Sequence, residues 1–171
     1  MKRSLTAAIL AIMILLAGCQ KPEAPMPEFG RDDLRLFIGG VWYSPDMDIE
    51  TVIAHLGGDY IYAEARSCDY DGLDKSFIYP AAEFYTYPST SGRDLVNEIY
   101  TQDISAQSSR GIGIGASQEE VFAAYSGIQD ASPFELVYSV PPSDDLPFGA
   151  SLCFDLAGGA VTAIYITARS L

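Results

Sequence analysis

The sequence predicts an α+β fold in which two tandem helix-plus-antiparallel-meander repeats form one sheet with short helices on one face. Two observations predict this fold. Two distant segments carry the same helix-start pattern, and each is followed at nearly constant spacing by a strand with the pattern Val-x-x-Ile-Tyr. Repeated supersecondary units of this kind indicate an internal duplication, and two copies are too few for a solenoid.

The clearest helix signal lies in residues 111–125, which predict a short strand, a tight turn and a capped helix. Ser117 and Glu120 have the spacing of a capping box, in which each side chain satisfies the other residue's free backbone N–H. Val121 and Tyr125 then fall on one apolar face at helical spacing. A Ser-Gly pair directly after the helix predicts its end.

A diverged copy of this helix runs from Asp48 to Gly58, with Asp48 at the N-cap position. The remaining positions correspond in order: Glu50 to Glu119, Val52 to Val121, Ala54 to Ala123 and Gly58 to Gly127.

The strand pattern Val-x-x-Ile-Tyr occurs at Val96–Tyr100, 44 residues after Val52, and at Val161–Tyr165, 40 residues after Val121. We therefore expect repeat 1 at residues 34–103 and repeat 2 at residues 104–171, forming a single globular domain. Each repeat contains about three antiparallel strands, and two short strands precede the first helix. The predicted strands are 34–38, 41–43, 77–79, 83–87 and 95–101, then 134–140, 151–156 and 161–168, with a polar loop at 67–75.

The N-terminal sequence predicts that the protein is exported and located outside the cytoplasm. A basic start is followed by an apolar run from Leu5 to Leu16 that is too short for a membrane span and is typical of a secretory signal. The residues Leu16-Ala-Gly-Cys19 resemble the bacterial lipobox. That resemblance implies a lipoprotein signal peptide at residues 1–18, cleavage before Cys19, and a palmitate-type diacyl group on the Cys19 sulfur that anchors the chain to the cell membrane. The alternatives are an ordinary signal peptide or an N-terminal anchor helix.

Residues 19–33 predict a disordered tether, since prolines and charged residues alternate there without periodicity. The formal net charge of the chain is −13, and loss of Lys2 and Arg3 with the signal would leave −15. Such acidity argues against binding to nucleic acid or to anionic lipid, and it favours basic or cationic partners. The alternative is a solvated surface that keeps a secreted protein soluble.

One cysteine falls in each predicted repeat, at Cys68 and Cys153. In an oxidising compartment these two could form a disulfide, and the alternative is two separate thiols. Alternation in the strand around Cys153 places its side chain on the face opposite Leu152, Phe154 and Leu156.

The chain resembles the superfamily of small outer-membrane lipoproteins and β-lactamase inhibitors through residues 113–121 and the two Val-x-x-Ile-Tyr strands. It is more similar to a family of uncharacterised cell-surface lipoproteins of monoderm bacteria. The motifs are Ser67-Cys-Asp-Tyr-Asp-Gly-Leu-Asp-Lys75, Thr86-Tyr-Pro88 and Gly111-Ile-Gly-Ile-Gly-Ala-Ser117. The resemblance implies a fold and a location but no chemistry. Ser126 stands where that family has Gly, so the end of the second helix departs from the pattern.

No catalytic constellation is present, and neither a metal nor a cofactor is expected. The loop at 67–75 has the first ligand positions of an EF-hand, but Ile78 stands where the closing Glu is required. The glycines at 111–115 lack the spacing and the Lys-Ser/Thr of a phosphate loop. The sole histidine, His55, has no nucleophile beside it in sequence. A hydrolase built on paired carboxylates is the least favoured alternative.

Tyrosines on or beside the predicted strands suggest a recognition surface, and the alternative is that Tyr is simply a favourable residue in strands. Helices cover only one face of a sheet, and Tyr is enriched at protein interfaces because it gives contact area at low entropy cost. We therefore expect a non-enzymatic protein- or peptide-binding module, with a cell-wall or glycan-binding protein as the alternative. The expected binding residues are Tyr70, Tyr79, Tyr85, Tyr87, Asp69, Asp71 and Asp74.

Overall fold

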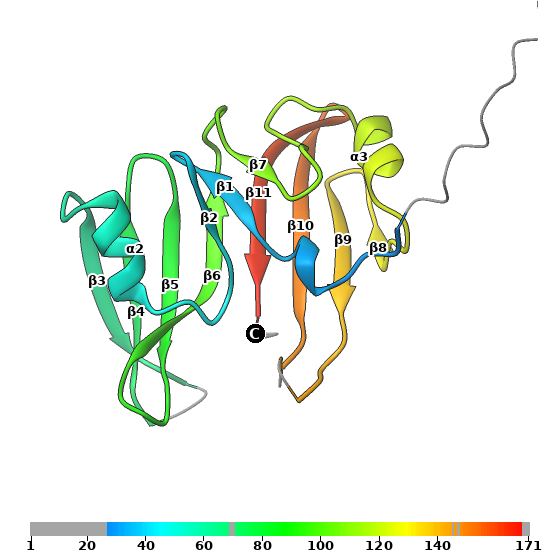
Figure 1. The fold of residues 1–171 in the computed structure, drawn as a ribbon. Coiled ribbons are helices and arrows are strands. Elements are labelled where there is room, and N and C mark those ends of the chain that lie inside the picture. The colour runs from blue at the N-terminus through cyan, green and yellow to red at the C-terminus, as the bar shows by residue number, and fades with distance from the viewer. Residues whose placement is uncertain (1–26, 69–70, 145, 147, 169–171) are drawn as a thin grey trace, which may run out of the picture.

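A computed structural model describes residues 27–68, 71–144, 146 and 148–168, and it shows a mostly β protein with two short helices (Figure 1). Strands β3 to β6 and β8 to β11 make one large antiparallel sheet, and β1, β2 and β7 make a small one. The first part of the chain comprises the 3-10 helix η2 (Arg31–Asp33), β1 (Leu36–Ile38), β2 (Val41–Tyr43), α2 (Ile49–Leu56), β3 (Ile61–Arg66), β4 (Leu73–Ile78), β5 (Glu83–Pro88) and β6 (Asp94–Thr101). The second part comprises β7 (Gln107–Ser108), α3 (Gln118–Ala124), β8 (Asp130–Ala131), β9 (Glu135–Val140), β10 (Ala150–Ala157) and β11 (Ala160–Thr167).

The large sheet has the strand order β3-β4-β5-β6-β11-β10-β9-β8. Helix α2 is followed by the meander β3 to β6, and helix α3 is followed by the meander β8 to β11. The two meanders meet where β6 pairs with β11, with Tyr100 directly opposite Tyr165 and Ile99 opposite Ile166. Both Val-x-x-Ile-Tyr segments therefore lie side by side in the middle of the sheet.

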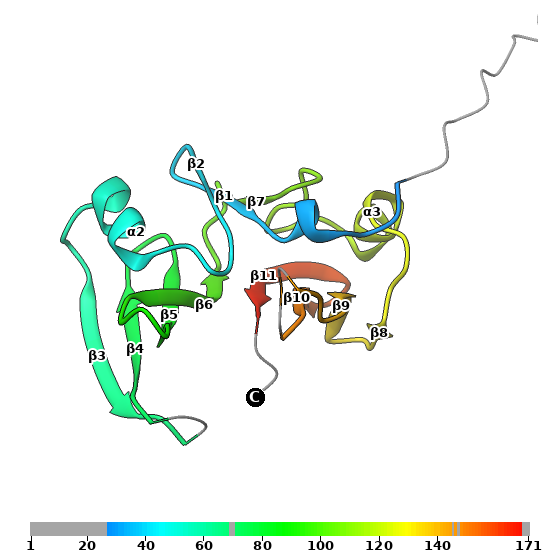
Figure 2. The ribbon, with the colours of Figure 1, turned by 60° about the horizontal axis from the view of Figure 1, so that its bottom comes forward.

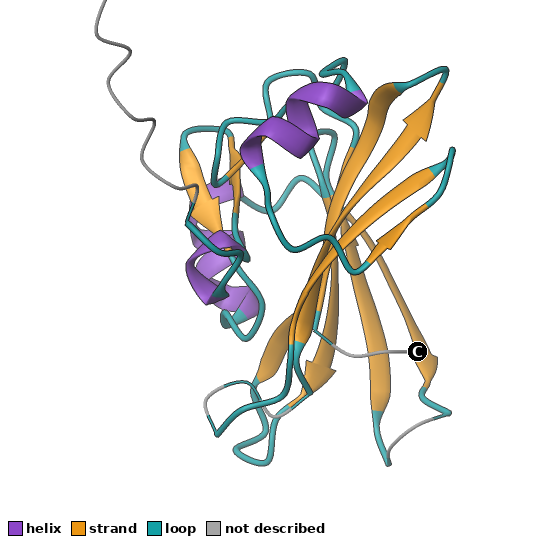
Figure 3. Cartoon of the chain, turned by 90° about the vertical axis from the view of Figure 1, so that its right-hand side faces the viewer, coloured by secondary structure: helices purple, strands orange, loops and turns teal. Residues whose placement is uncertain are grey.

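The small sheet and both helices cover the same face of the large sheet, and the described residues leave its other face uncovered (Figures 2 and 3). The prediction of helices on one face holds, but the prediction of one sheet is wrong. Strand β1 pairs with β2 on one side and with β7 on the other, so the segments before each helix separate from the main sheet. Each meander also has four strands instead of three. The extra strand β3 escaped prediction because all six of its residues are exposed, which removes the alternation of apolar residues that marks a half-buried strand.

The two helices begin where their cap signals place them. The Asp48 side chain accepts a hydrogen bond from the Glu50 backbone N–H at 3.0 Å, and Ser117 and Glu120 form the reciprocal capping box. The helices bury Ile49, Val52 and Val121 against the sheet. Caps of this type stabilise a helix by about 1 kcal/mol each, which matters for helices of two turns.

The core lies between the large sheet and the layer that covers it. Strand β5 illustrates the division of faces: Phe84 and Thr86 are buried on the covered side, at 0% and 3% exposure, whereas Tyr85 and Tyr87 alternate to the other side and are half-buried. The predicted sharing of one face by Tyr85 and Tyr87 is therefore confirmed. The covered side is rich in aromatic contacts, such as Tyr43 with Phe84 at 5.3 Å between ring centroids.

The disordered tether predicted at residues 19–33 includes residues that are part of the folded domain. Residues 27–33 pack onto the covered side, where the Phe29 ring contacts Tyr125 and Tyr138 at centroid distances of 5.9 and 5.7 Å. Asp33 is 8% exposed at the end of η2. The signal peptide, Cys19 and the first part of the tether lie outside the described residues.

Candidate binding surface

The uncovered face of the large sheet carries a group of tyrosine, carboxylate and cysteine side chains from several strands. Residues directly opposite each other on neighbouring antiparallel strands point to the same face. One row across the sheet runs Glu83, Tyr100, Tyr165 and Cys153, and an adjacent row joins Tyr85 to Glu98. We call this surface the open face, and define it by Asp74, Ser76, Glu83, Tyr85, Tyr87, Glu98, Tyr100, Glu135, Cys153, Asp155 and Tyr165.

Tyrosine and carboxylate side chains contact one another along the middle of the open face. The rings of Tyr100 and Tyr165 lie 6.2 Å apart at the junction of the two meanders. The Tyr85 hydroxyl donates a hydrogen bond to Glu83, and the Tyr165 hydroxyl donates to Glu135. The Glu83 hydrogen bond, together with burial, raises the pKa of Tyr85 to about 12, so this hydroxyl remains a donor at neutral pH.

The carboxylates of the open face lie close enough to repel one another. Partial burial and the negative charge of Glu83 raise the pKa of Glu98 above its ordinary value of 4.5. Burial and Glu135 likewise raise the pKa of Asp155. The described strand residues on this face include no Lys or Arg. The arrangement therefore lacks a positive charge that would neutralise it, and a cationic group could supply one.

We expect replacement of Glu98 by glutamine to raise the free energy of unfolding at pH 7 by about 0.5–1 kcal/mol, because it removes a partly buried charge and its repulsion by Glu83. A carboxyl with a raised pKa in the folded state contributes stability that is complete below its ordinary value and is lost as pH rises through the raised value. The native chain should therefore gain stability as pH falls from 7 towards 4.5, and the Glu98→Gln variant should gain less. Urea denaturation across this pH range measures both effects.

Glu119→Gln is the matched control, since Glu119 is exposed on α3, away from the open face. It removes the same charge and should leave the pH dependence unchanged. A Glu98→Gln variant less stable than the native chain at pH 7 would contradict the repulsion.

The structure separates the predicted binding residues into three groups. Tyr85 and Tyr87 lie on the open face, and the Tyr87 hydroxyl donates to Asp46 at 2.6 Å. Tyr79 does not: it is 6% exposed on the covered side, and its hydroxyl donates to the backbone oxygen of Gly57 at 3.0 Å. The inclusion of Tyr79 was wrong because Pro80 and the following turn shift the alternation between β4 and β5.

The remaining predicted residues belong to the β3–β4 hairpin. Strand β4 begins at Leu73, so the turn is shorter than the predicted loop. Asp71 is fully exposed and lies 3.8 Å from Arg66, and Asp74 is exposed at the rim of the open face. Lys75 pairs with Asp94 across the sheet at 2.7 Å. Asp69 and Tyr70 lie outside the described residues. No group of three potential metal ligands occurs among the residues that the structure describes.

The disulfide between Cys68 and Cys153 is wrong for a single chain. Cys68 is exposed just beyond β3, and Cys153 is buried in β10. Five strand spacings of about 4.8 Å separate these strands in the sheet, whereas a disulfide requires Cα atoms within about 7 Å. The predicted orientation of Cys153 holds: it pairs with Tyr165 on the open face, and burial raises the pKa of its thiol to about 12.

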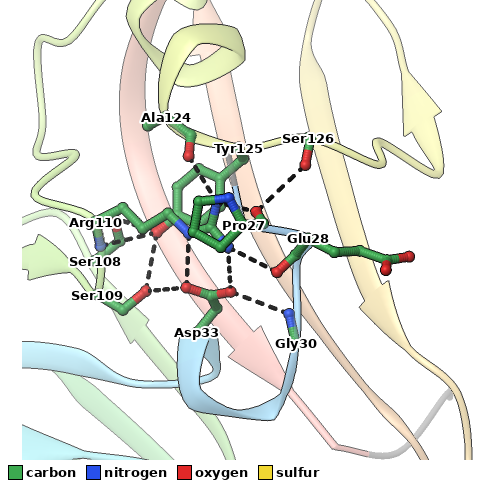
Figure 4. Close-up of polar contacts among 10 residues, drawn as sticks. All are labelled: Pro27, Glu28, Gly30, Asp33, Ser108, Ser109, Arg110, Ala124, Tyr125 and Ser126. Carbon is green, nitrogen blue, oxygen red and sulfur yellow. Dashed lines mark hydrogen bonds and ion pairs between the residues drawn. The ribbon is translucent and has the colours of Figure 1, made fainter. Parts of the chain in front are cut away.

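A second polar cluster lies on the covered side, around Arg110 (Figure 4). Its Nε and Nη2 donate to the Asp33 carboxylate at 2.8 and 2.6 Å. Nη1 donates to the backbone oxygens of Pro27 and Ala124, both at 2.9 Å, and Nη2 donates also to that of Glu28 at 3.0 Å. All five guanidinium protons are thereby used, so this cluster, which we call the Arg110 clasp, fastens residues 27–33 and leaves no donor for a ligand.

Sequence reasoning missed the acidic half of the open face, namely Glu83, Glu98, Glu135 and Asp155. Each is the sole acid of its predicted strand, and in sequence the four are scattered over 73 positions. The signal that could have found them is the alternation itself, because each acid lies one residue from a buried apolar neighbour and must therefore point to the uncovered side.

Comparison of the chain with protein-family models, with curated proteins and with solved structures found no match. Among the described residues, no helix is long and apolar enough to cross a membrane.

Proposed function

We propose that this protein is a non-enzymatic binding module, held at the outer side of the cell membrane by an acylated Cys19, that captures a protein or peptide on its open face. The observation that carries the proposal is the open face itself: a broad uncovered sheet surface with tyrosines at its centre and carboxylates around them. Tyrosine side chains supply contact area at low entropy cost, which is the composition of recognition surfaces.

The charge of the open face supports a basic partner. Glu83, Glu98, Glu135 and Asp155 are all acidic, and the described strand residues of this face include no Lys or Arg. A partner segment rich in Lys or Arg would relieve the repulsion, and its cationic groups would also stack on tyrosine rings. We therefore infer that the bound segment is basic.

We further propose that the chain arose by internal duplication. The order of a capped helix followed by a four-stranded meander occurs twice. Where the meanders meet, Tyr100 faces Tyr165, Thr101 faces Ile164 and Ile99 faces Ile166, which is the pairing expected of two equivalent strands around a two-fold axis. The equivalent residues Ile99 and Ile164 are both fully buried. The duplication doubles the meander and so produces a face wide enough for a peptide.

The binding proposal is tested with a lysine-rich peptide of eight residues and a glutamate-rich peptide of the same length, followed by fluorescence anisotropy. The lysine-rich peptide should bind, more weakly as salt rises, and Tyr85→Ala with Tyr87→Ala should weaken its binding about 30-fold. Glu83→Gln with Glu98→Gln should weaken it to a similar degree.

The matched control removes two charges elsewhere. Glu50→Gln with Glu119→Gln changes the two helices and also removes two negative charges, so it reports non-specific attraction to an acidic protein. Equal loss of binding in both double variants would reject the open face as the site. Binding to isolated cell wall that depends on Tyr85, without binding to the peptide, would support the glycan-binding alternative instead.

The membrane location has its own test. Labelled palmitate should be incorporated into the native chain on growing cells and lost in the Cys19→Ala variant, which should then be found in the medium. Continued labelling of Cys19→Ala would contradict the anchor.

A further inference from the structure

One edge of the large sheet has no neighbouring strand among the residues that the structure describes. Strand β3 pairs there with β4 on one side only, and each of its six residues is exposed. The exposed residues of β3 include large apolar side chains: Ile61 is 70% exposed and Tyr62 is 46% exposed. Backbone N–H and C=O groups along such an edge are free to pair with a further strand.

The two edges of the sheet differ in their protection. Edge strands are usually shortened, bulged, or supplied with proline or lysine so that other strands cannot pair with them. The edge strand β8 has two residues, Asp130 and Ala131, and is protected by its length. Strand β3 has six residues without proline or lysine, and its register with β4 contains no bulge. The exposed edge of β3 therefore has the features of a docking strand.

We propose that the end of β3 pairs antiparallel with the end of β3 of a second copy of this chain, about a two-fold axis at Ala65, so that residues 64–66 of the two copies lie opposite one another. In this register the charged residues of one β3 strand lie opposite residues of opposite charge in the other. Glu64 lies opposite Arg66 of the second copy, and the symmetry forms the same ion pair twice. A shift of the register by two residues towards the start of the strand would place Glu64 opposite its own copy, where the charges repel.

The charged groups are available for this pairing. Arg66 and Asp71 are 85% and 100% exposed and lie 3.8 Å apart, so their existing contact is weak. The Glu64 carboxylate is exposed and accepts a hydrogen bond only from the neighbouring Tyr62 hydroxyl among the contacts described. Ala65 and Ala63 alternate to the opposite side, where small side chains let two strands approach. The pairing is independent of what the open face binds.

Cysteine cross-linking tests the register in the full chain carrying Cys68→Ser. In the proposed dimer, Ala65→Cys places two Cα atoms about 4.5–5.5 Å apart, within disulfide reach. Ala63→Cys, on the same side of the strand, places them about 14 Å apart. Mild oxidation should therefore give at least tenfold more disulfide dimer with Ala65→Cys than with Ala63→Cys. Equal cross-linking of the two variants, or cross-linking of Ala65→Cys to other proteins alone, would overturn the proposal.

Charge exchange provides the second test, in the Ala65→Cys chain. Glu64→Arg alone and Arg66→Glu alone each place like charges opposite each other and should reduce the dimer several-fold. The double exchange restores opposite charges and should restore the dimer. Failure of the double exchange to recover cross-linking, with an unchanged unfolding midpoint, would overturn the assigned register. Since all three positions are exposed, the fold itself should tolerate these changes.

Discussion

Replacement of Arg110 by alanine is expected to lower the free energy of unfolding by about 3–5 kcal/mol, because it leaves the Asp33 carboxylate buried without its partner. The same change removes the donors to the backbone oxygens of Pro27, Glu28 and Ala124. Arg110 also lies over the Tyr125 ring at 4.8 Å, and that contact is lost too. Urea denaturation followed by circular dichroism measures the effect.

Arg93→Ala is the matched control. Arg93 also pairs with an aspartate, Asp48 at 3.3 Å, but its side chain is 63% exposed, so its removal should cost less than about 1 kcal/mol. Equal losses in the two variants would mean that burial does not distinguish the two ion pairs.

The clasp also predicts how stability depends on pH at the acidic end. Burial raises the pKa of Asp33, but hydrogen bonds from Arg110, Gly30 and Ser109 outweigh it and hold the pKa below the ordinary value of 3.8. A lowered pKa contributes stability that is present above 3.8 and is lost as pH falls through the folded-state value. The native chain should therefore lose stability below about pH 4, and Arg110→Ala should lose less over that interval.

Replacement of Gly149 by alanine should lower the free energy of unfolding by about 2–5 kcal/mol. Gly149 has a φ of +67°, which costs a residue with a Cβ atom about 1–2 kcal/mol. An added Cβ would also lie 2.7 Å from the backbone oxygen of Val140 and 3.2 Å from the backbone nitrogen of Pro142. Neither is a side chain that can rotate away, so the turn between β9 and β10 must shift, with a further loss of about 1–3 kcal/mol.

Gly158→Ala separates the two contributions. Gly158 has a φ of +61° in the turn between β10 and β11, and an added Cβ would meet no atom within 4 Å. Its variant should therefore cost only about 1–2 kcal/mol. Thermal unfolding compares the stability of the two variants. Equal unfolding midpoints would mean that the backbone clash does not destabilise Gly149→Ala.

Features governed by neighbouring residues were predictable from the sequence. The caps at Asp48 and Ser117 depend on groups within three positions, so the helix starts were correct. The alternation in β5 likewise assigned Tyr85 and Tyr87 to one face. The central strands with buried Ile99 and Ile164 were found because burial on one side leaves a strong pattern.

Features governed by distant partners were not predictable. Strand β1 pairs with β7, about 70 positions away, and nothing local distinguishes it from a strand of the main sheet. Arg110 and Asp33 are 77 positions apart, so neither indicates the clasp on its own. The grouping of Glu83, Glu98, Glu135 and Asp155 requires the strand order, which a single sequence does not contain.

The Arg110 clasp determines how far the domain can move if Cys19 is its point of attachment. Eight peptide steps separate Cys19 from Pro27, which is a reach of at most about 28 Å. Without the clasp the free chain would extend to Leu34, and fifteen steps reach about 52 Å. Residues 27–33 lie on the covered side, so a tether from Cys19 would join the domain on the side opposite the open face. One buried arginine would thereby set the length of chain between the anchor and the folded domain.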